Sequence, residues 1–174
     1  MRFEGLAEQS CSISRSLVLL GDRWTLAIVK QAFARTRRFE DFLTTLGISR
    51  ALLADRLRRL SEAGVFEKVR YDSARPRYEY HLTDAGFALY PILQAIREWG
   101  DAHLAPEGAP LLYAHRGCTG SAMVTMACST CHTPLSARDI DVQLGPGLTG
   151  PASGARARPS RARRRARGRR PTPA

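Results

Sequence analysis

The spacing of the large apolar residues changes abruptly at Gly64. Before this glycine, apolar side chains recur at intervals of three and four residues, which is the period of an amphipathic helix. Between residues 65 and 82 they alternate with polar residues in two short runs, which is the period of a strand. Such a chain must bury its helical faces against one another, so the pattern predicts a mainly α fold with a small β-hairpin.

The same spacing places the individual elements along the chain. Helices are predicted at residues 12–20, 23–34, 39–46 and 49–63. Strands are predicted at residues 65–71 and 78–82, with a turn between them. A last helix is predicted from residue 83 to about residue 103, with a kink at Pro91 because proline lacks the N–H that an internal turn uses. Three helices, a fourth that follows a tight turn at Gly47, and a hairpin predict a winged helix-turn-helix.

Composition divides the chain into three parts. Residues 1–105 carry the winged helix, residues 106–145 form a small Cys/His module, and residues 146–174 form an arginine-rich tail. Nine of the 27 Lys and Arg residues lie in the last 24 positions, where there is no acid and no large apolar side chain. We expect this tail to be disordered, because it cannot bury enough surface to offset its chain entropy. The tail also carries most of the net charge of +11, so a partner for the folded part must be inferred from where its arginines lie.

The predicted helix at residues 49–63 has two faces of opposite character. At about 100° per residue its leucines share one side, which must face the core: Leu52, Leu53, Leu57 and Leu60. The other side carries Arg50, Ala51, Ala54, Asp55 and Arg58. Alanines let a helix approach a DNA groove closely, and arginines reach phosphates and guanine edges. The hydroxyl and free N–H groups at the helix start suit a phosphate, so the residues assigned to the groove are Ser49, Arg50, Ala54 and Arg58.

Further arginines flank this helix. Arg75 and Arg77 lie at the predicted hairpin turn, where a wing follows the DNA backbone or enters the minor groove. Arg37 and Arg38 precede the third helix and are candidates for backbone contact. Arg56 lies at the rim of the core face, where a phosphate contact and an internal ion pair are both open. Any one arginine alone is explained as well by a solvated surface charge, but three groups at the places where a winged helix meets DNA predict double-stranded DNA as the partner.

Several motifs of the chain resemble those of one family. They are Gly21-Asp22-Arg23-Trp24-Thr25-Leu26, Arg38-Phe39, Gly47-Ile48-Ser49, Leu53 with Arg56-Leu57, Gly64, and the run from Tyr78 to Gly86. In this order and spacing, over about residues 11–104, the chain resembles the HxlR-type, MarR-like winged helix-turn-helix regulators of transcription. The resemblance implies a homodimer that binds an operator with inverted half-sites and controls nearby genes, often as a repressor. It also implies a redox-sensing role for Cys11, as in some members, and the alternative is an inert thiol.

The last predicted helix carries an apolar stripe that agrees with dimerisation. The stripe consists of Leu89, Ile92, Leu93, Ile96 and Trp99. It is more apolar surface than a small domain needs for its own core, so we expect the terminal helices of two chains to pack in a C2 dimer. The alternative is that Ile96 and Trp99 pack on the first helix of their own chain.

The Cys/His module contains two pairs of residues with metal-ligand chemistry. His115 and Cys118 are separated by two residues, as are Cys128 and Cys131, and nine residues lie between the pairs. Four nitrogen and sulfur ligands in two close pairs can surround one tetrahedral Zn²⁺, which would stabilise a module too small for its own core. His132 could replace His115, and thiols without metal are the other alternative.

Other classes of protein find little support in the sequence. No Ser/His/Asp set, paired carboxylates or glycine-rich phosphate loop stands out, so we expect no enzyme and no required cofactor. The chain has no apolar run of membrane-spanning length and no secretory signal, so we expect a cytoplasmic protein without membrane contact. A small-molecule or redox effector is compatible with this interpretation. The alternative function is a redox- or metal-responsive module whose winged helix contacts protein, which exposed large apolar residues on the helix at 49–63 would favour.

Overall fold

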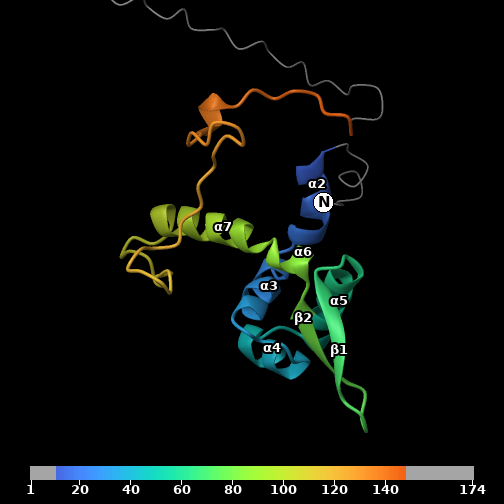
Figure 1. The fold of residues 1–174 in the computed structure, drawn as a ribbon. Coiled ribbons are helices and arrows are strands. Elements are labelled where there is room, and N and C mark those ends of the chain that lie inside the picture. Colours follow the sequence, from blue (N-terminus) through green and yellow to red (C-terminus); the bar gives the residue numbers. More distant parts are fainter. Residues whose placement is uncertain (1–10, 148–174) are drawn as a thin grey trace, which may run out of the picture. The chain divides into compact units, whose positions relative to one another are not determined.

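The computed structural model describes residues 11–147, and its elements follow the predicted order (Figure 1). The helices are α2 (Ser12–Leu20), α3 (Thr25–Phe33), α4 (Phe39–Leu46), α5 (Arg50–Glu62), α6 (Asp84–Phe87), α7 (Tyr90–His103) and the short 3-10 helix η1 (Ala137–Asp139). The strands are β1 (Phe66–Asp72) and β2 (Arg77–Leu82). The chain divides into two compact units between Thr125 and Met126, and all the elements from α2 to α7 belong to the first. This arrangement confirms the predicted winged helix.

The core of the first unit lies where α3, α4 and α5 meet the start of the hairpin. Its buried members are Ile28, Val29, Phe42, Leu53, Leu57, Leu60, Val65 and Phe66. Three of these come from one face of α5, as the spacing of its leucines predicts. Burying each large apolar side chain contributes about 1.5–3 kcal/mol, so this face fixes how α5 is rotated about its axis.

Glycines in the left-handed region end both helices of the helix-turn-helix. Gly47 ends α4 with φ 62°, which a residue without a β-carbon adopts at little cost. Two residues later, the Ser49 side chain accepts a hydrogen bond from the Leu52 backbone N–H at 3.3 Å and begins α5. Gly64, at φ 72°, stops the chain from continuing as a helix before β1. The turn between α4 and α5 is therefore tight and well defined.

The hairpin is antiparallel and is attached to the helices at its base. Phe66 pairs with Leu82, and the pairing becomes irregular near Asp72. At the tip, one Asp72 carboxylate oxygen accepts hydrogen bonds from two successive backbone N–H groups, at 2.9 and 3.1 Å. Near the base, the Tyr80 N–H donates to the Arg37 carbonyl at 2.8 Å, which brings the segment before α4 alongside β2. Figure 1 shows the hairpin projecting beyond the helices, as a wing does.

The predicted kink at Pro91 is wrong. The last helix is instead broken into α6 and α7, with Pro91 in the first turn of α7. In a first turn the missing N–H has no helical partner to lose, so proline begins this helix rather than bending one. The break also lets α6 approach the hairpin closely: a β-carbon at Gly86 would collide with the Val65 carbonyl oxygen and the Leu82 side chain.

The second helix begins slightly later than predicted. It starts at Thr25 as α3, with Trp24 as its N-cap residue. The Asp22 carboxylate accepts a hydrogen bond from the Trp24 N–H at 2.9 Å and holds the turn before the helix.

Among residues 11–147, both α7 and α2 leave large apolar side chains uncovered in the single chain. On α7, Ile96 and Trp99 are 49% and 58% exposed. On α2 itself, Ile13 is 72% exposed and Leu17 46%. Within residues 11–147, no helix has the length and apolar character needed to cross a membrane. The predicted disordered tail lies, from residue 148 onward, outside the described residues.

Candidate nucleic-acid interface

The outward face of α5 consists of the residues that the sequence assigned to a DNA groove. Ser49, Arg50, Ala54 and Arg58 are all exposed, whereas Leu53, Leu57 and Leu60 on the opposite side are at most 1% exposed. Among residues 50–62 no large apolar side chain is strongly exposed. From Ser49 to Ala54 the exposed side chains are therefore small or cationic, and free N–H groups there add partial positive charge.

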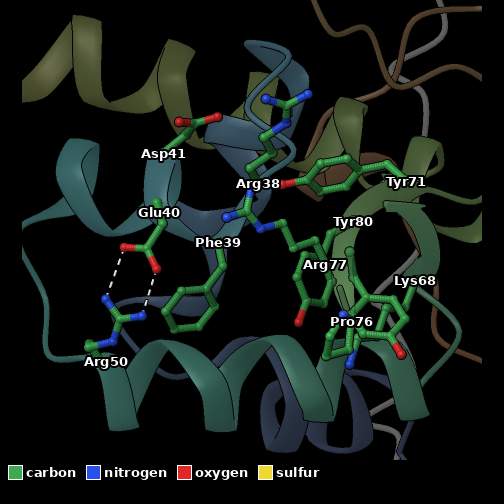
Figure 2. Close-up of a pocket in the computed structure, with 11 residues that line it drawn as sticks. Arg38, Phe39, Glu40, Asp41, Arg50, Lys68, Tyr71, Pro76, Arg77 and Tyr80 are labelled. Atoms are coloured by element: carbon green, nitrogen blue, oxygen red, sulfur yellow. Dashed lines mark hydrogen bonds and ion pairs between the residues drawn. The ribbon is translucent and has the colours of Figure 1, made fainter. Parts of the chain in front are cut away.

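The two outward arginines of α5 hold carboxylates in the DNA-free protein. Arg50 donates through Nη1 and Nη2 to the two oxygens of Glu40, at 2.9 and 2.6 Å (Figure 2). Arg58 donates to Glu62 at 2.8 Å and to Asp55 at 2.8 Å. The hydrogen bonding from Arg50 lowers the pKa of the Glu40 carboxyl group. Ion pairs this exposed contribute little to stability, so a stronger acceptor can replace the carboxylates.

Arg56 differs from its neighbours because its side chain is only 15% exposed. It donates to Asp22 at 2.9 Å and to Asp55 at 2.6 Å. The pKa of Asp22 is lowered, chiefly by this hydrogen bond from Arg56. Of the two alternatives for Arg56, the geometry favours the internal ion pair, which ties α5 to the turn before α3.

Sequence reasoning missed a related contact made by Arg59. Its guanidinium donates to the Val18 carbonyl at 3.2 Å and ties α5 to α2. The partner lies 41 residues away in sequence, so no local pattern could have indicated it.

The arginines before α4 lie against the hairpin. Arg38 donates to Glu79 at 3.0 Å, and its guanidinium lies over the Tyr71 ring at 4.6 Å. Arg37 contacts His81 Nδ1 at 2.6 Å. Both arginine side chains are exposed, so the segment offers positive charge beside β2.

The hairpin adds cations and aromatic rings that the sequence analysis did not assign. Arg75 and Arg77 are exposed at and near the tip, as predicted. Lys68 lies over the Tyr78 ring, with Nζ 4.1 Å from the ring centre. The alternation of β1 and β2 is the signal that could have found them, because Lys68 stands opposite Tyr80 and Arg70 opposite Tyr78.

These side chains line one groove between α4, the start of α5 and the hairpin (Figure 2). Its lining consists of Arg38, Phe39, Glu40, Asp41, Arg50, Lys68, Tyr71, Pro76, Arg77, Tyr78 and Tyr80. The structure thus brings together members of the three groups predicted to meet DNA: the start of α5, the segment before α4 and the wing. The groove can accept an extended anion through its cations and the flat faces of its rings.

The four cysteines are not among the residues that line this groove. Cys11 is the N-cap residue of α2 and is exposed, and hydrogen bonding to Ser14 lowers the pKa of its thiol. Because Cys11 is exposed, burial does not make its thiol inert. The redox-sensing role of Cys11 stays a prediction.

Each predicted metal-ligand pair forms a tight turn of its own. In the first unit, His115 Nδ1 lies 3.3 Å from Cys118 Sγ, and the same sulfur accepts a hydrogen bond from the Gly120 N–H at 3.3 Å. In the second unit, the His132 N–H donates to the Cys128 carbonyl at 3.0 Å, and His132 itself has φ 57°. Hydrogen bonds with Thr133 lower the pKa of Cys131 to about 7. Within residues 11–147, no three His, Cys, Asp or Glu side chains are grouped so as to hold a metal.

Comparison with known proteins gives one consistent result. A family model described as HxlR-like helix-turn-helix matches residues 19–108. The HTH-type transcriptional regulator Rv3095 of Mycobacterium tuberculosis, itself uncharacterised, is 41% identical over 148 residues, which is 84% of this chain and 90% of that protein. This match is too long to end at residue 108, so the similarity extends into the cysteine-containing segment.

Two solved structures resemble the chain over most of its length. PA1607, a candidate transcription factor, is 35% identical with a TM-score of 0.72, and the match covers 80% of this chain and 98% of that one. PA1374 of Pseudomonas aeruginosa, another candidate transcription factor, is 31% identical with a TM-score of 0.58 and coverage of 80% and 95%. These similar proteins are described as transcription regulators and not as enzymes.

The partly buried ion pair of Arg56 leads to a stability prediction. Arg56→Ala should lower the free energy of unfolding by about 1–3 kcal/mol, because Asp22 loses its partner. Arg58→Ala, which breaks only exposed pairs on the same helix, should leave the free energy of unfolding nearly unchanged. Urea denaturation of both variants measures the difference, and equal losses would contradict the internal role.

The effect of Arg56→Ala should also depend on pH. The pKa of Asp22 is lowered in the folded protein, so the pair stabilises the fold above the ordinary aspartate pKa of about 4 and stops doing so as the pH falls below it. The gap between wild type and Arg56→Ala should therefore narrow below about pH 4.

Proposed function

Because the chain belongs to the HxlR-like helix-turn-helix family of transcription regulators, we propose that it binds an inverted-repeat operator as a homodimer and represses the adjoining genes. The helix-turn-helix supplies the DNA-binding domain. Repression needs no further contact, since a dimer that occupies an operator within a promoter excludes polymerase from it. Separate features of the chain support the DNA surface, the dimer and a bound metal.

The observation that carries the proposal is the outward face of α5. Arg50 and Arg58 flank the small, exposed Ala54 on a helix whose other face is locked into the core. A helix of this shape enters the major groove with its N-terminal residues at the base edges, while Ser49 and the free N–H groups meet a phosphate. The hairpin then reaches the neighbouring backbone with Arg75 and Arg77.

A protein partner for this face is the weaker alternative. A protein-binding helix presents large apolar anchors that become buried on association. The large apolar residues that are exposed within residues 11–147 lie on α2, on the hairpin, on α6 and α7, and in the segments after α7, but not on α5. The face of α5 therefore suits a polyanion better than a second protein.

The apolar surface of α7 supports the homodimer. Ile92, Ile96 and Trp99 form a stripe at helical spacing, and each is at least 44% exposed in the single chain. Removing such a stripe from water is worth about 25 cal/mol for each Å² buried, and a C2 axis lets the same stripe cover its own copy. Two recognition helices would then face successive turns of one DNA duplex.

The DNA-binding proposal predicts the effect of truncating the outward arginines. Arg50→Ala and Arg58→Ala should each weaken operator binding about 5- to 150-fold, the range for losing a base contact. The operator is first selected by the full-length protein from random duplexes, and a scrambled duplex then gives the background, including the contribution of the arginine-rich tail. Fluorescence anisotropy at two salt concentrations measures both affinities.

Arg138→Ala is the matched control for that experiment. It removes the same charge from an exposed position in the second unit and should leave the operator affinity unchanged. If both α5 variants keep the wild-type preference for the operator over the scrambled duplex, the assignment of this face to the groove is wrong.

The dimer proposal is tested by placing a charge in the stripe. Ile96→Lys should raise the dimer dissociation constant at least tenfold, because two unpaired ammonium groups would have to be buried at the axis. Val69→Lys makes the same change at an apolar site of similar exposure on β1 and should leave the dimer intact. Sedimentation equilibrium measures both, and a wild-type monomer or an unaffected Ile96→Lys dimer would contradict the proposal.

We propose that the cysteine-containing segment binds Zn²⁺, for which the sequence offers two pairs of ligands, His115 with Cys118 and Cys128 with Cys131. Two local features support it. The Gly120 N–H points at Cys118 Sγ, a contact that stabilises a thiolate, and the residue after Cys131 adopts the left-handed conformation that a tight chelating turn requires. Each pair lies in a tight turn of its own, and its nitrogen and sulfur atoms are donors that zinc prefers.

Metal analysis tests the zinc proposal. Full-length protein purified without chelator should contain one zinc per chain, as measured by inductively coupled plasma mass spectrometry. The double variant Cys128→Ser, Cys131→Ser should contain none, whereas Cys11→Ser should keep it. Absence of zinc from wild-type protein supplied with the metal would rule the proposal out.

A further inference from the structure

The guanidinium of Arg50 already holds a two-pronged acceptor in the DNA-free protein. Its Nη1 and Nη2 each donate to a different oxygen of Glu40, at 2.9 and 2.6 Å. Guanine offers arginine the same geometry, with O6 and N7 as a pair of acceptors in the major groove. Glu40 thus makes the bidentate contact with Arg50 that a cognate base would make.

The surroundings of this pair keep it in place without making it strong. The Arg50 guanidinium lies over the Phe39 ring, 5.2 Å from its centre (Figure 2). Glu40 lies in the first turn of α4, where a helix favours an acid. Both side chains are 65% exposed, so the pair exchanges readily for a better partner.

Glu40 also introduces negative charge where a phosphate backbone would pass. It lines the same groove as Arg38, Lys68 and Arg77. Its carboxylate contacts Arg50, the first residue of α5. On any duplex its carboxylate repels the phosphates. Only a DNA sequence that offers Arg50 two acceptors compensates for breaking its pair with Glu40.

We propose that Glu40 competes with DNA for Arg50, holding the guanidinium in the free protein and on non-cognate DNA and yielding it to a cognate guanine. This inference rests on the proposed function. It makes Glu40 a positioning residue, which acts on DNA binding through Arg50. On a cognate site, two hydrogen bonds to guanine replace two to Glu40. On other DNA, Arg50 gains at most a phosphate contact, so its pair with Glu40 is kept.

Glu40→Gln removes the charge and the strong acceptor with almost no change in shape. Affinity for the selected operator should rise about two- to fivefold, because binding there no longer breaks an exposed ion pair of this strength. Affinity for the scrambled duplex should rise less, because wild-type Arg50 keeps its pair with Glu40 there. The ratio of operator affinity to scrambled-duplex affinity, which is the measure of discrimination, should therefore rise.

Glu67→Gln is the matched control. Glu67 is an exposed residue of β1 outside the groove, and it makes no ion pair within residues 11–147. The substitution changes the charge of the domain by the same amount, so it should leave the ratio as in the wild type. Equal rises in the ratio for Glu40→Gln and Glu67→Gln would reduce the effect to net charge and overturn the proposal.

A double substitution ties the effect to Arg50. In an Arg50→Ala background, Glu40→Gln should no longer alter the ratio, and thermal melting should show that each variant stays folded. An unchanged ratio for Glu40→Gln in the wild-type background, or the same rise when Arg50 is absent, would overturn the inference. A wild-type protein that does not distinguish operator from scrambled duplex would instead overturn the proposed function, so the two failures are distinguishable.

Discussion

The leucine face of α5 is buried against α3, α4 and the base of the hairpin, and the rest of the surface depends on that contact. Leu53, Leu57 and Leu60 leave almost no area exposed to water. Because successive residues of a helix are turned by about 100°, burying these three decides which residues point away. Arg50, Ala54 and Arg58 are presented outward as a consequence of core packing, without any need for separate contacts to hold the helix in this orientation.

The position of each arginine on α5 determines what it does. Arg56 lies at the edge of the buried face, so its charge is satisfied internally by Asp22 and contributes to stability. Arg50 and Arg58 lie on the exposed face and hold carboxylates that solvent largely screens. An arginine of α5 thus forms either an internal ion pair or an exchangeable contact. Its position around the helix axis decides which of the two it forms.

Local patterns were sufficient to predict the elements and the faces of α5, and insufficient where a partner is distant in sequence. Helical and strand periodicity gave the order of the elements, and the burial of the α5 leucines confirms the predicted core face. Pro91 is compatible with a kink and with a helix start, and only the packing of α6 under the hairpin distinguishes them. Asp22 is 34 residues from Arg56, so that ion pair could be named only as one of two alternatives. The contact between Glu40 and Arg50 crosses the turn between two helices and leaves no periodic signal.

Hydrogen exchange of the full-length protein, with and without its selected operator, tests the central claim most directly. The first N–H groups of α5 have no helical acceptor and exchange quickly in the free protein, as do the exposed amides of the hairpin tip. The account predicts that DNA slows exchange at the start of α5, at residues 72–77 and in the segment before α4, and leaves residues 126–147 unchanged. Slowed exchange confined to α7 or to the second unit, with α5 and the hairpin unaffected, would contradict it.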